Sequence, residues 1–379
     1  MNLLLFAVSD VAETILYILL ALVVLLVMIT IHEAGHYTAG KILGFKINEF
    51  AIGMGPKLFS RKKKNGEVFS VRLFPLGGYC AFEGEDENMP DSPDAFNSQK
   101  PWKRIIVLVS GALFNFISAI LIVFIAFWAF GDDALAIQKV YESSVNYDAY
   151  QQGTGFKEGD IIYKIDGKVV YLVVDVSNYI AGAGDEMDVV VLRENAQGKR
   201  EKVTIENVRK GKFTVDKLDE NGNVVLDENG NPVKEEANGW GVQNAYVKNS
   251  FTFGQALGRS VPYCLRAGGY ILETLGGLIT GRVPIKDIGG PITTIDMITQ
   301  VIRTGFSNVL FLITLISVNL AVFNLLPLPA LDGSRVIFVL IEWIFRKPVN
   351  RKVEGWIHAI GMILLFGLVI LVDVLRYLT

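Results

Sequence analysis

Four long apolar runs limit the folds open to this chain more than any other feature of its sequence. They cover Ile15 to about Leu43, Ile105 to Phe130, Val309 to Leu326 and about Ile357 to Val374. A helix needs about 20 consecutive apolar residues to cross the hydrocarbon core of a bilayer. Hydrophobic residues make up 51% of the chain. We therefore expect a polytopic α-helical membrane protein with four transmembrane helices.

A polar cluster, His32-Glu33-Ala34-Gly35-His36, lies within the first run. Residues four apart share one face of a helix, so His32 and His36 can present two imidazoles to one zinc ion. Glu33 beside them would then be the catalytic base of a metalloprotease. This short pattern also occurs in helices that bind no metal. Inside a membrane span, however, two histidines and a glutamate are costly unless they serve a function.

The third run ends in a segment, 324–333, that suggests the remaining ligand. Pro327 and Pro329 cannot continue a regular helix, so the backbone must open there, which at membrane depth requires a protein or wet surrounding. Asp332 follows this break and is the candidate third metal ligand. If the first and third spans both end at the cytoplasmic face, Asp332 reaches the depth of the histidine pair. His358, at the start of the fourth run, is expected to be an ordinary interfacial histidine.

The loop between the first two runs is rich in lysine and arginine, so the positive-inside rule places it in the cytoplasm. Residues 67–74 alternate between apolar and polar, and 75–79 read as a turn and a second extended piece. This pattern predicts a β-hairpin beside the membrane. Its edge, with Val71, Gly77 and Gly78, could pair with an extended peptide substrate. A loop packed on the helix ends is the open alternative.

Residues 131–250 are polar and long enough for an inserted α+β domain on the outer side. Within them, Gly155 to Gly167 has a Gly-Asp turn, an apolar strand and an Asp-Gly turn, which resembles the core signature of peptide-binding PDZ domains. A plain turn-strand-turn unit is the alternative. The segments 218–223 and 226–231 repeat an Asn-Gly pair, for which successive hairpin turns are expected and a calcium loop is the weaker alternative.

The positions of charged residues predict the structure and orientation of the remainder of the chain. Residues 253–281 have apolar positions at helical spacing, but Arg259, Arg266 and Glu273 interrupt them. We expect this segment and a second one to about Arg303 to be amphipathic helices on the outer face. The basic loop 346–352 is expected inside, so both termini lie outside. The expected parts are a first membrane half (1–130), a PDZ-like domain (131–250), amphipathic helices (251–305) and a second membrane half (306–379).

With these motifs in this order, the chain resembles the site-2 protease family of intramembrane zinc metalloproteases over nearly its full length. Phe74 to Tyr79 followed by Gly84-Glu85 makes it most similar to the bacterial branch typified by the regulator of sigma-E protease. One PDZ-like domain is evident where some members have two. The resemblance implies Zn²⁺ held by His32, His36 and Asp332. It also implies that Glu33 is the base and that Asn324 and Pro327 contact the substrate, with helix capping as the alternative for Asn324.

The resemblance also implies a function in regulated intramembrane proteolysis at the bacterial cell membrane. Substrates would be single-pass membrane proteins, such as anti-sigma factors or remnant signal peptides. Expected partners are the lipid bilayer, the substrate, and a peptide or substrate terminus at the PDZ-like domain; the net charge of -3 does not indicate nucleic acid. A non-catalytic PDZ-bearing scaffold is the main alternative, which the intact Glu33 and Asp332 oppose. A zinc transporter would need more ionisable residues along the spans.

Overall fold

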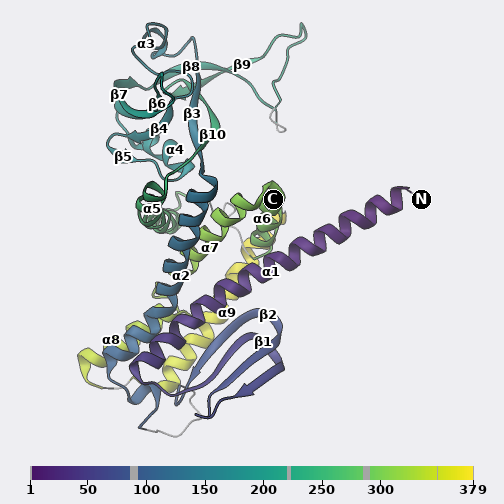
Figure 1. Cartoon of the computed structure of the whole chain (residues 1–379), viewed down its shortest axis with the longest axis vertical. Coiled ribbons are helices and arrows are strands. Elements are labelled where there is room, and N and C mark those ends of the chain that lie inside the picture. Colours follow the sequence, from purple (N-terminus) through teal and green to yellow (C-terminus); the bar gives the residue numbers. More distant parts are fainter. Residues whose placement is uncertain (1, 86–92, 220–222, 285–290, 348, 379) are drawn as a thin grey trace. The chain divides into compact units, whose positions relative to one another are not determined.

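A computed structural model describes residues 2–85, 93–219, 223–284, 291–347 and 349–378 (Figure 1). The chain forms two compact units. Met1–Ala126 and Arg259–Thr379 make one, called here the helical unit, and Phe127–Gly258 makes the other, called the inserted unit. The first 126 residues therefore pack with the last 121 of the chain, although the inserted unit separates them in sequence.

Long helices dominate the helical unit. Four helices are long and apolar enough to cross a membrane, over Ile15–Leu43, Pro101–Phe130, Phe306–Leu325 and Lys352–Val372. These segments confirm the four spans expected from the apolar runs. The α-helices that lie wholly or mostly in this unit are α1 (Asn2–Leu43), α2 (Pro101–Phe130), α5 (Phe253–Ile279), α6 (Pro291–Thr304), α7 (Phe306–Leu325), α8 (Asp332–Phe345) and α9 (Arg351–Leu378).

Three of these helices, α5, α6 and α8, are not among the four candidate spans. The segment that forms α5 carries charged residues along its length, and it is not among the helices apolar enough to cross. The 14-residue helix α8 begins at Asp332, directly after the proline-containing segment. No sequence pattern predicts α8, because residues 334–345 lie between two apolar runs and show neither the length of a span nor a distinct start signal.

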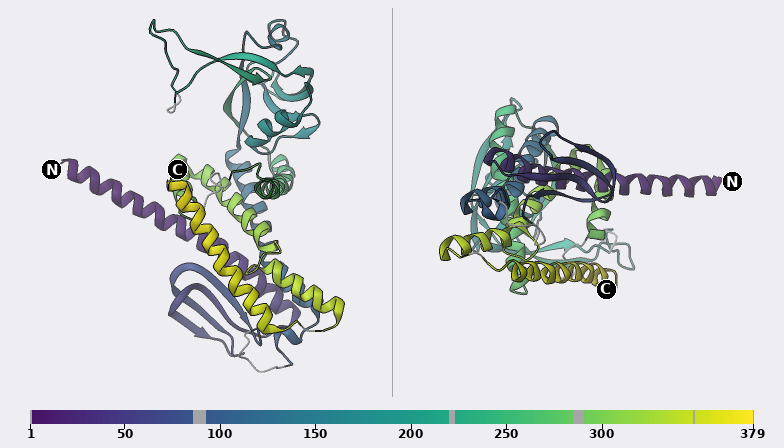
Figure 2. Two further views of the ribbon diagram at one scale, coloured as in Figure 1. Left: turned by 180° about the vertical axis from the view of Figure 1, so that it is seen from behind. Right: turned by 90° about the horizontal axis from the view of Figure 1, so that it is seen from below.

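A β-sheet lies beside the C-terminal half of α1, where the sequence predicts a hairpin (Figure 2). Strand β1 (Ile47–Lys62) pairs antiparallel with β2 (Val68–Phe82). The turn lies at 63–67, where Gly66 N–H donates to the Lys63 carbonyl at 3.0 Å. The turn and second extended piece expected at 75–79 are present within β2. Residues 68–71 run in the same direction as 49–52 and residues 78–81 in the opposite direction, so the chain reverses between 74 and 78, where Gly77 takes the left-handed φ of +97°.

The register of this sheet places its free edge elsewhere than expected. Residues 49–52 of β1 pair with 78–81 of β2 on one side and with 68–71 on the other. Val71 therefore has two partners, Ile52 and Phe59, and lies inside the sheet. The expectation that Val71 lies at the free edge was wrong. Among the described residues, no further strand pairs with the segment 78–82, which is called here the edge segment.

The inserted unit is an α+β structure with a core of its own. Its central sheet has the order β10-β3-β4-β6-β7, with β5 paired to β4. Buried side chains such as Phe156, Ile165, Val189 and Trp240 fill this core. The elements are β3 (Asp132–Val140), α3 (Tyr147–Gln151), β4 (Ile161–Ile165), β5 (Lys168–Val169), α4 (Val173–Gly182), β6 (Glu186–Glu194), β7 (Arg200–Arg209), β8 (Gly211–Asp216), β9 (Lys234–Gly239) and β10 (Val242–Asn249).

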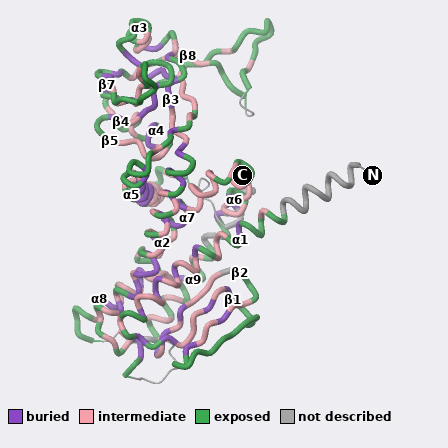
Figure 3. Tube along the Cα trace, viewed as in Figure 1, coloured by how far each residue is buried: buried purple, intermediate pink, exposed green. Residues whose placement is uncertain are grey.

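The turn-strand-turn expected at Gly155 to Gly167 is present as β4 and its flanking turns. The described residues of the two repeated segments lie in a largely exposed arm beyond β8 and β9 (Figure 3). The second of them is a turn, in which Asp227 N–H donates to the Asn231 carbonyl and the Asp227 carboxylate accepts from the Asn231 N–H, both at 2.8 Å. Residues 220–222 of the first repeat lie outside the described residues.

Candidate metal centre

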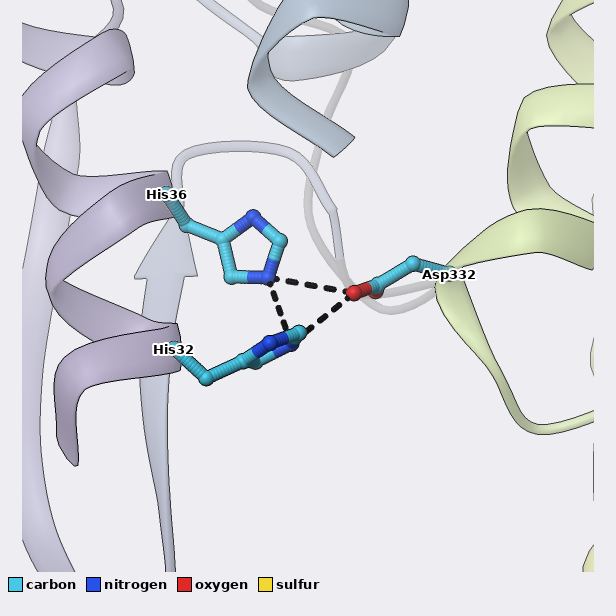
Figure 4. Close-up of side chains that lie close together, drawn as sticks. All are labelled: His32, His36 and Asp332. Atoms are coloured by element: carbon cyan, nitrogen blue, oxygen red, sulfur yellow. Dashed lines mark hydrogen bonds and ion pairs between the residues drawn. The ribbon is translucent and has the colours of Figure 1, made fainter. Parts of the chain in front are cut away.

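Three side chains from distant parts of the sequence converge in the helical unit (Figure 4). The Nε2 atoms of His32 and His36 lie 3.1 Å apart. The Oδ2 atom of Asp332 lies 3.0 Å from Nε2 of His32 and 3.2 Å from Nε2 of His36. In the described part of the chain, these three residues form the one group of three side chains able to share a metal ion.

This arrangement fits a zinc ion. With bonds of about 2.0 Å, neighbouring ligand atoms of a tetrahedral zinc site are about 3.3 Å apart, close to the distances seen here. Two imidazoles and one carboxylate are also the donors of catalytic zinc sites, which leave a fourth position open. Both histidines are buried. Three donor atoms directed at one point inside protein are costly without a cation to share them.

The second nitrogen of each imidazole faces α2. Nδ1 of His36 lies 2.8 Å from the Val107 carbonyl oxygen, which can accept but not donate, so Nδ1 carries the hydrogen and Nε2 is free for a metal. Nδ1 of His32 lies 3.5 Å from Nδ2 of Asn115. Exchange of the amide oxygen and nitrogen, which have nearly the same shape, would give His32 an acceptor as well.

Asn115 was not among the predicted site residues. It is fully buried, and its Oδ1 has no hydrogen-bond partner among the described residues. Its main-chain carbonyl oxygen accepts from the Ser317 hydroxyl of α7 at 2.8 Å. A lone asparagine in an otherwise apolar span was the available signal, because such a group is expensive in a membrane unless it has a partner.

The ligands line a cavity of about 550 Å³ in the helical unit. Glu33 also lines it, as the base of the expected mechanism should. Asn324 of α7 and the edge segment of β2 contribute further walls. The lining residues are Ile29, His32, Glu33, His36, Tyr79, Cys80, Ala81, Phe82, Glu85, Phe96, Val107, Leu108, Asn115, Leu320, Asn324, Ala330, Asp332 and Arg335.

The other predicted substrate-contacting residues fall into three places. Gly78 adjoins the cavity, since a Cβ atom on it would lie 3.5 Å from Cγ of Glu33. Gly77 and the exposed Pro327 are not among the lining residues. Val71 lies inside the sheet. The structure therefore brings Asn324 and Gly78 to the site and leaves the other three outside the cavity wall.

Ion pairs hold α8, which begins with Asp332, against its neighbours. Arg104 of α2 contacts Glu342 of α8 at 2.6 Å. Arg335 of α8 contacts Glu85 at 2.6 Å, and the same carboxylate accepts from the Phe82 N–H at 3.1 Å. These contacts tie the third ligand to both α2 and the edge segment. No local sequence pattern indicates these contacts, because the partners are far apart in the chain.

Comparison with known proteins agrees with this geometry. The model of peptidase family M50 matches residues 20–368. A candidate zinc metalloprotease of Clostridium perfringens is 33% identical, over 95% of this chain and 98% of that protein. One of Fusobacterium nucleatum is 31% identical, over 94% and 97%. Zinc metalloprotease RasP of Bacillus licheniformis is 27% identical, over 91% and 94%. With a family match over most of its length and relatives of similar extent, the chain belongs to peptidase family M50, the site-2 type of membrane zinc metalloprotease.

Proposed function

We propose that this protease cleaves single-pass membrane proteins within or near the bilayer, as a step of regulated intramembrane proteolysis. The observation that carries the proposal is the convergence of His32, His36 and Asp332 in a cavity that also contains Glu33. The two histidines belong to a helix apolar enough to span a membrane. A protease with its ligands in such a helix is placed to reach peptide bonds that water-soluble proteases do not.

In this proposal, His32, His36 and Asp332 hold the ion. Zinc bound there supplies an acidified water and polarises the scissile carbonyl. Glu33 takes the proton of the attacking water and passes it to the leaving amine. Asn324, on the cavity wall, is placed to donate a hydrogen bond to the carbonyl oxygen as negative charge develops on it.

The edge segment would hold the substrate extended. A helical substrate satisfies its backbone polar groups internally, so its peptide bonds must be released before attack. Residues 79–82 line the cavity and have no strand on their outer side among the described residues. An extended peptide could add to this edge and lie past Glu33 and the ligands.

The proposal also assigns each part of the chain to one side of the membrane. The basic loop around β1 and β2 would lie in the cytoplasm of a bacterial cell, with both termini and the inserted unit outside. The inserted unit, as a PDZ-like domain, would limit access by size or bind a substrate terminus. Anti-sigma factors and remnant signal peptides are the substrates that the family resemblance suggests.

The decisive experiment compares wild type with Glu33→Gln on a tagged single-pass substrate co-expressed in bacteria. We expect a cleavage product with wild type, no product with Glu33→Gln, and equal zinc content in both purified proteins. Glutamine keeps the shape of Glu33 but cannot accept the proton. Equal cleavage by both proteins would contradict the assigned base and favour a non-catalytic role for this centre.

A further inference from the structure

Helix α9 makes a hydrogen bond to the segment that carries Asp332. The N–H of Ala330 donates to Nδ1 of His358 at 3.0 Å. Because a backbone N–H can donate but not accept, Nδ1 is the acceptor and the ring hydrogen is on Nε2. The bond fixes a backbone position two residues before the third ligand, from a helix that contributes no ligand itself.

The backbone at this point needs such support. Ala330 has a φ of +75°, in the left-handed region. This conformation costs a residue with a Cβ atom about 1 kcal/mol, and it persists only where the surroundings determine it. Pro327 and Pro329 have no N–H groups, so this segment has few donors with which to stabilise its own turn. The N–H of Leu331 bonds the Leu328 carbonyl at 3.2 Å, and α8 begins at the next residue, Asp332.

A second contact confines the same segment. Gly361 lies three residues after His358, on the same face of α9. A Cβ atom at Gly361 would lie 2.0 Å from Cβ of Pro329. Helix α9 therefore approaches the segment too closely for any side chain at this point. The ring of Phe338, on α8, lies 5.7 Å from the imidazole of His358 and limits its movement.

We infer that His358 is a positioning residue for the metal centre. Its hydrogen bond to Ala330 holds the left-handed turn that directs the Asp332 carboxylate at His32 and His36. It thereby sets the zinc affinity of the site without contacting the ion or the substrate. The inference rests on the proposed ligand set and is independent of which substrate is cleaved.

The test measures metal binding by the full-length protein in detergent. Zinc affinity is obtained by competition with a chelator, and the coordination geometry from the visible spectrum of the Co²⁺-loaded protein. We expect His358→Leu to weaken zinc binding about 10- to 100-fold, as losses around metal ligands do, and to change the Co²⁺ bands. His358→Asn should stay within about threefold of wild type, because its Oδ1 stands where Nδ1 accepts the bond.

A second pair of variants tests the approach of α9 without altering the imidazole. Gly361→Ala should push α9 away from Pro329 and weaken zinc binding as His358→Leu does. Gly367→Ala, on the same helix, is the matched control, since its Cβ would meet no atom within 4 Å. If His358→Leu does not fold, the comparison of Gly361→Ala with Gly367→Ala still tests the inference.

Three outcomes would overturn the inference. One is wild-type affinity and an unchanged Co²⁺ spectrum in both His358→Leu and Gly361→Ala. Another is equal impairment of His358→Leu and His358→Asn, which would assign His358 to packing. The third is a wild-type protein that binds neither Zn²⁺ nor Co²⁺ tightly, and this result would also contradict the proposed zinc site.

Discussion

Single glycines allow the two helices at the metal centre to approach each other. A Cβ atom at Gly35 of α1 would lie 2.3 Å from the Ser110 carbonyl oxygen of α2. A Cβ atom at Gly111 of α2 would lie 2.5 Å from Nε2 of His36 and 2.7 Å from Cε1 of His32. The absence of a side chain at Gly111 thus leaves the space that the two imidazoles occupy.

We therefore expect Gly111→Ala to damage the site more than the fold. The added methyl group displaces His36, which is packed between α1 and the Val107 carbonyl, so zinc affinity should fall about tenfold or more and cleavage should fall with it. The measurements are zinc affinity and substrate cleavage, with gel filtration to check folding. Gly276→Ala is the control, because its Cβ would meet no atom within 4 Å. Unchanged zinc affinity in Gly111→Ala would contradict this account.

Residues whose role follows from local spacing could be assigned to the candidate site from the sequence. His32 and His36 stand one helical turn apart, and Glu33 adjoins them. Asp332 could be assigned because it follows a proline-broken span. The roles of Asn115 and His358 depend on partners 83 and 28 residues away. No local pattern encodes such a partner, so His358 was expected to be an ordinary interfacial residue.

Among the secondary-structure elements, the turn of the β1–β2 sheet is fastened to α1. Glu67 accepts hydrogen bonds from Lys41 of α1 and from Lys63, the latter at 2.7 Å. Burial disfavours the charged form of Glu67, but the hydrogen bonds from these two lysines outweigh it and lower the pKa of Glu67 to about 2. Lys41 lies five residues after His36, so this contact anchors the sheet near the metal centre.

The lowered pKa predicts a pH-dependent contribution to stability. An acidic group whose pKa falls on folding stabilises the protein above its unfolded value of 4.5, and the contribution is lost as pH falls toward 2. Hydrogen bonds to charged groups contribute about 1.5 to 3 kcal/mol each. Glu67→Gln should therefore lower the apparent melting temperature in detergent at pH 7, and the difference from wild type should shrink below pH 4.5.

Glu273→Gln is the control for this experiment. Glu273, whose side chain is exposed, forms an ion pair with the mostly buried Arg266 on α5, and ion pairs at the surface contribute about 0 to 1 kcal/mol. We expect it to change the melting temperature little at either pH. A Glu67→Gln protein as stable as wild type at pH 7, or a difference that persists unchanged at low pH, would show that Glu67 does not anchor the sheet.

The edge segment predicts an alternating pattern of contacts with a bound substrate. In an added strand, successive side chains point to opposite faces. A Glu33→Gln protein with Cys80 and Cys264 replaced by alanine and a single cysteine at position 79 would hold an uncleaved substrate. Disulfide crosslinking to substrates with single cysteines at six successive positions should then alternate with a period of two. The yield is read from non-reducing gels.

Val71→Cys in the same background is the matched control, because Val71 has strand partners on both sides and should give no alternating pattern. A yield that repeats every three to four substrate positions would indicate that the substrate is still helical, and would contradict strand addition. Equal yields from positions 71 and 79 would show that the crosslinks do not report the edge.

A helix or strand could be predicted from the sequence where all its side chains, or all those on one face, meet the same surroundings. The four spans follow from apolar length, and their positions are confirmed. The strand at 68–74 was found from its alternation, and the turn after it from Pro75 and the glycines that follow. The pairing of 68–71 and 78–81 with opposite sides of 49–52 was not predicted, because it joins segments that are far apart in sequence. The segment of α8 gave too weak a local signal for a short helix between spans.

At the scale of the whole molecule, the inserted unit has a core separate from the metal centre. Its sheet buries Val189 and Val191 completely between its strands and α4, while every residue of the metal-centre cavity belongs to the helical unit. The polar composition of 131–250 predicted a separate folded domain. Its role in selecting substrates depends on how a substrate meets it, which the sequence does not encode.

This separation predicts that the inserted unit can be unfolded without loss of the metal site. Val189→Asp places a charge in the core of the sheet, which costs several kcal/mol, and should make residues 127–258 sensitive to protease. Zinc content should stay at the wild-type level. If the unit limits access by size, the variant should also cleave a single-pass substrate that keeps its outer domain, which wild type should cleave only after that domain is trimmed.

Val224→Asp adds the same charge on the exposed arm and is the matched control. It should leave protease resistance of the sheet, zinc content and substrate range unchanged. Loss of zinc in Val189→Asp would show that the two units depend on each other for folding. Retained zinc with an unchanged substrate range would show that the two units fold independently. It would also show that the inserted unit takes no part in excluding untrimmed substrates.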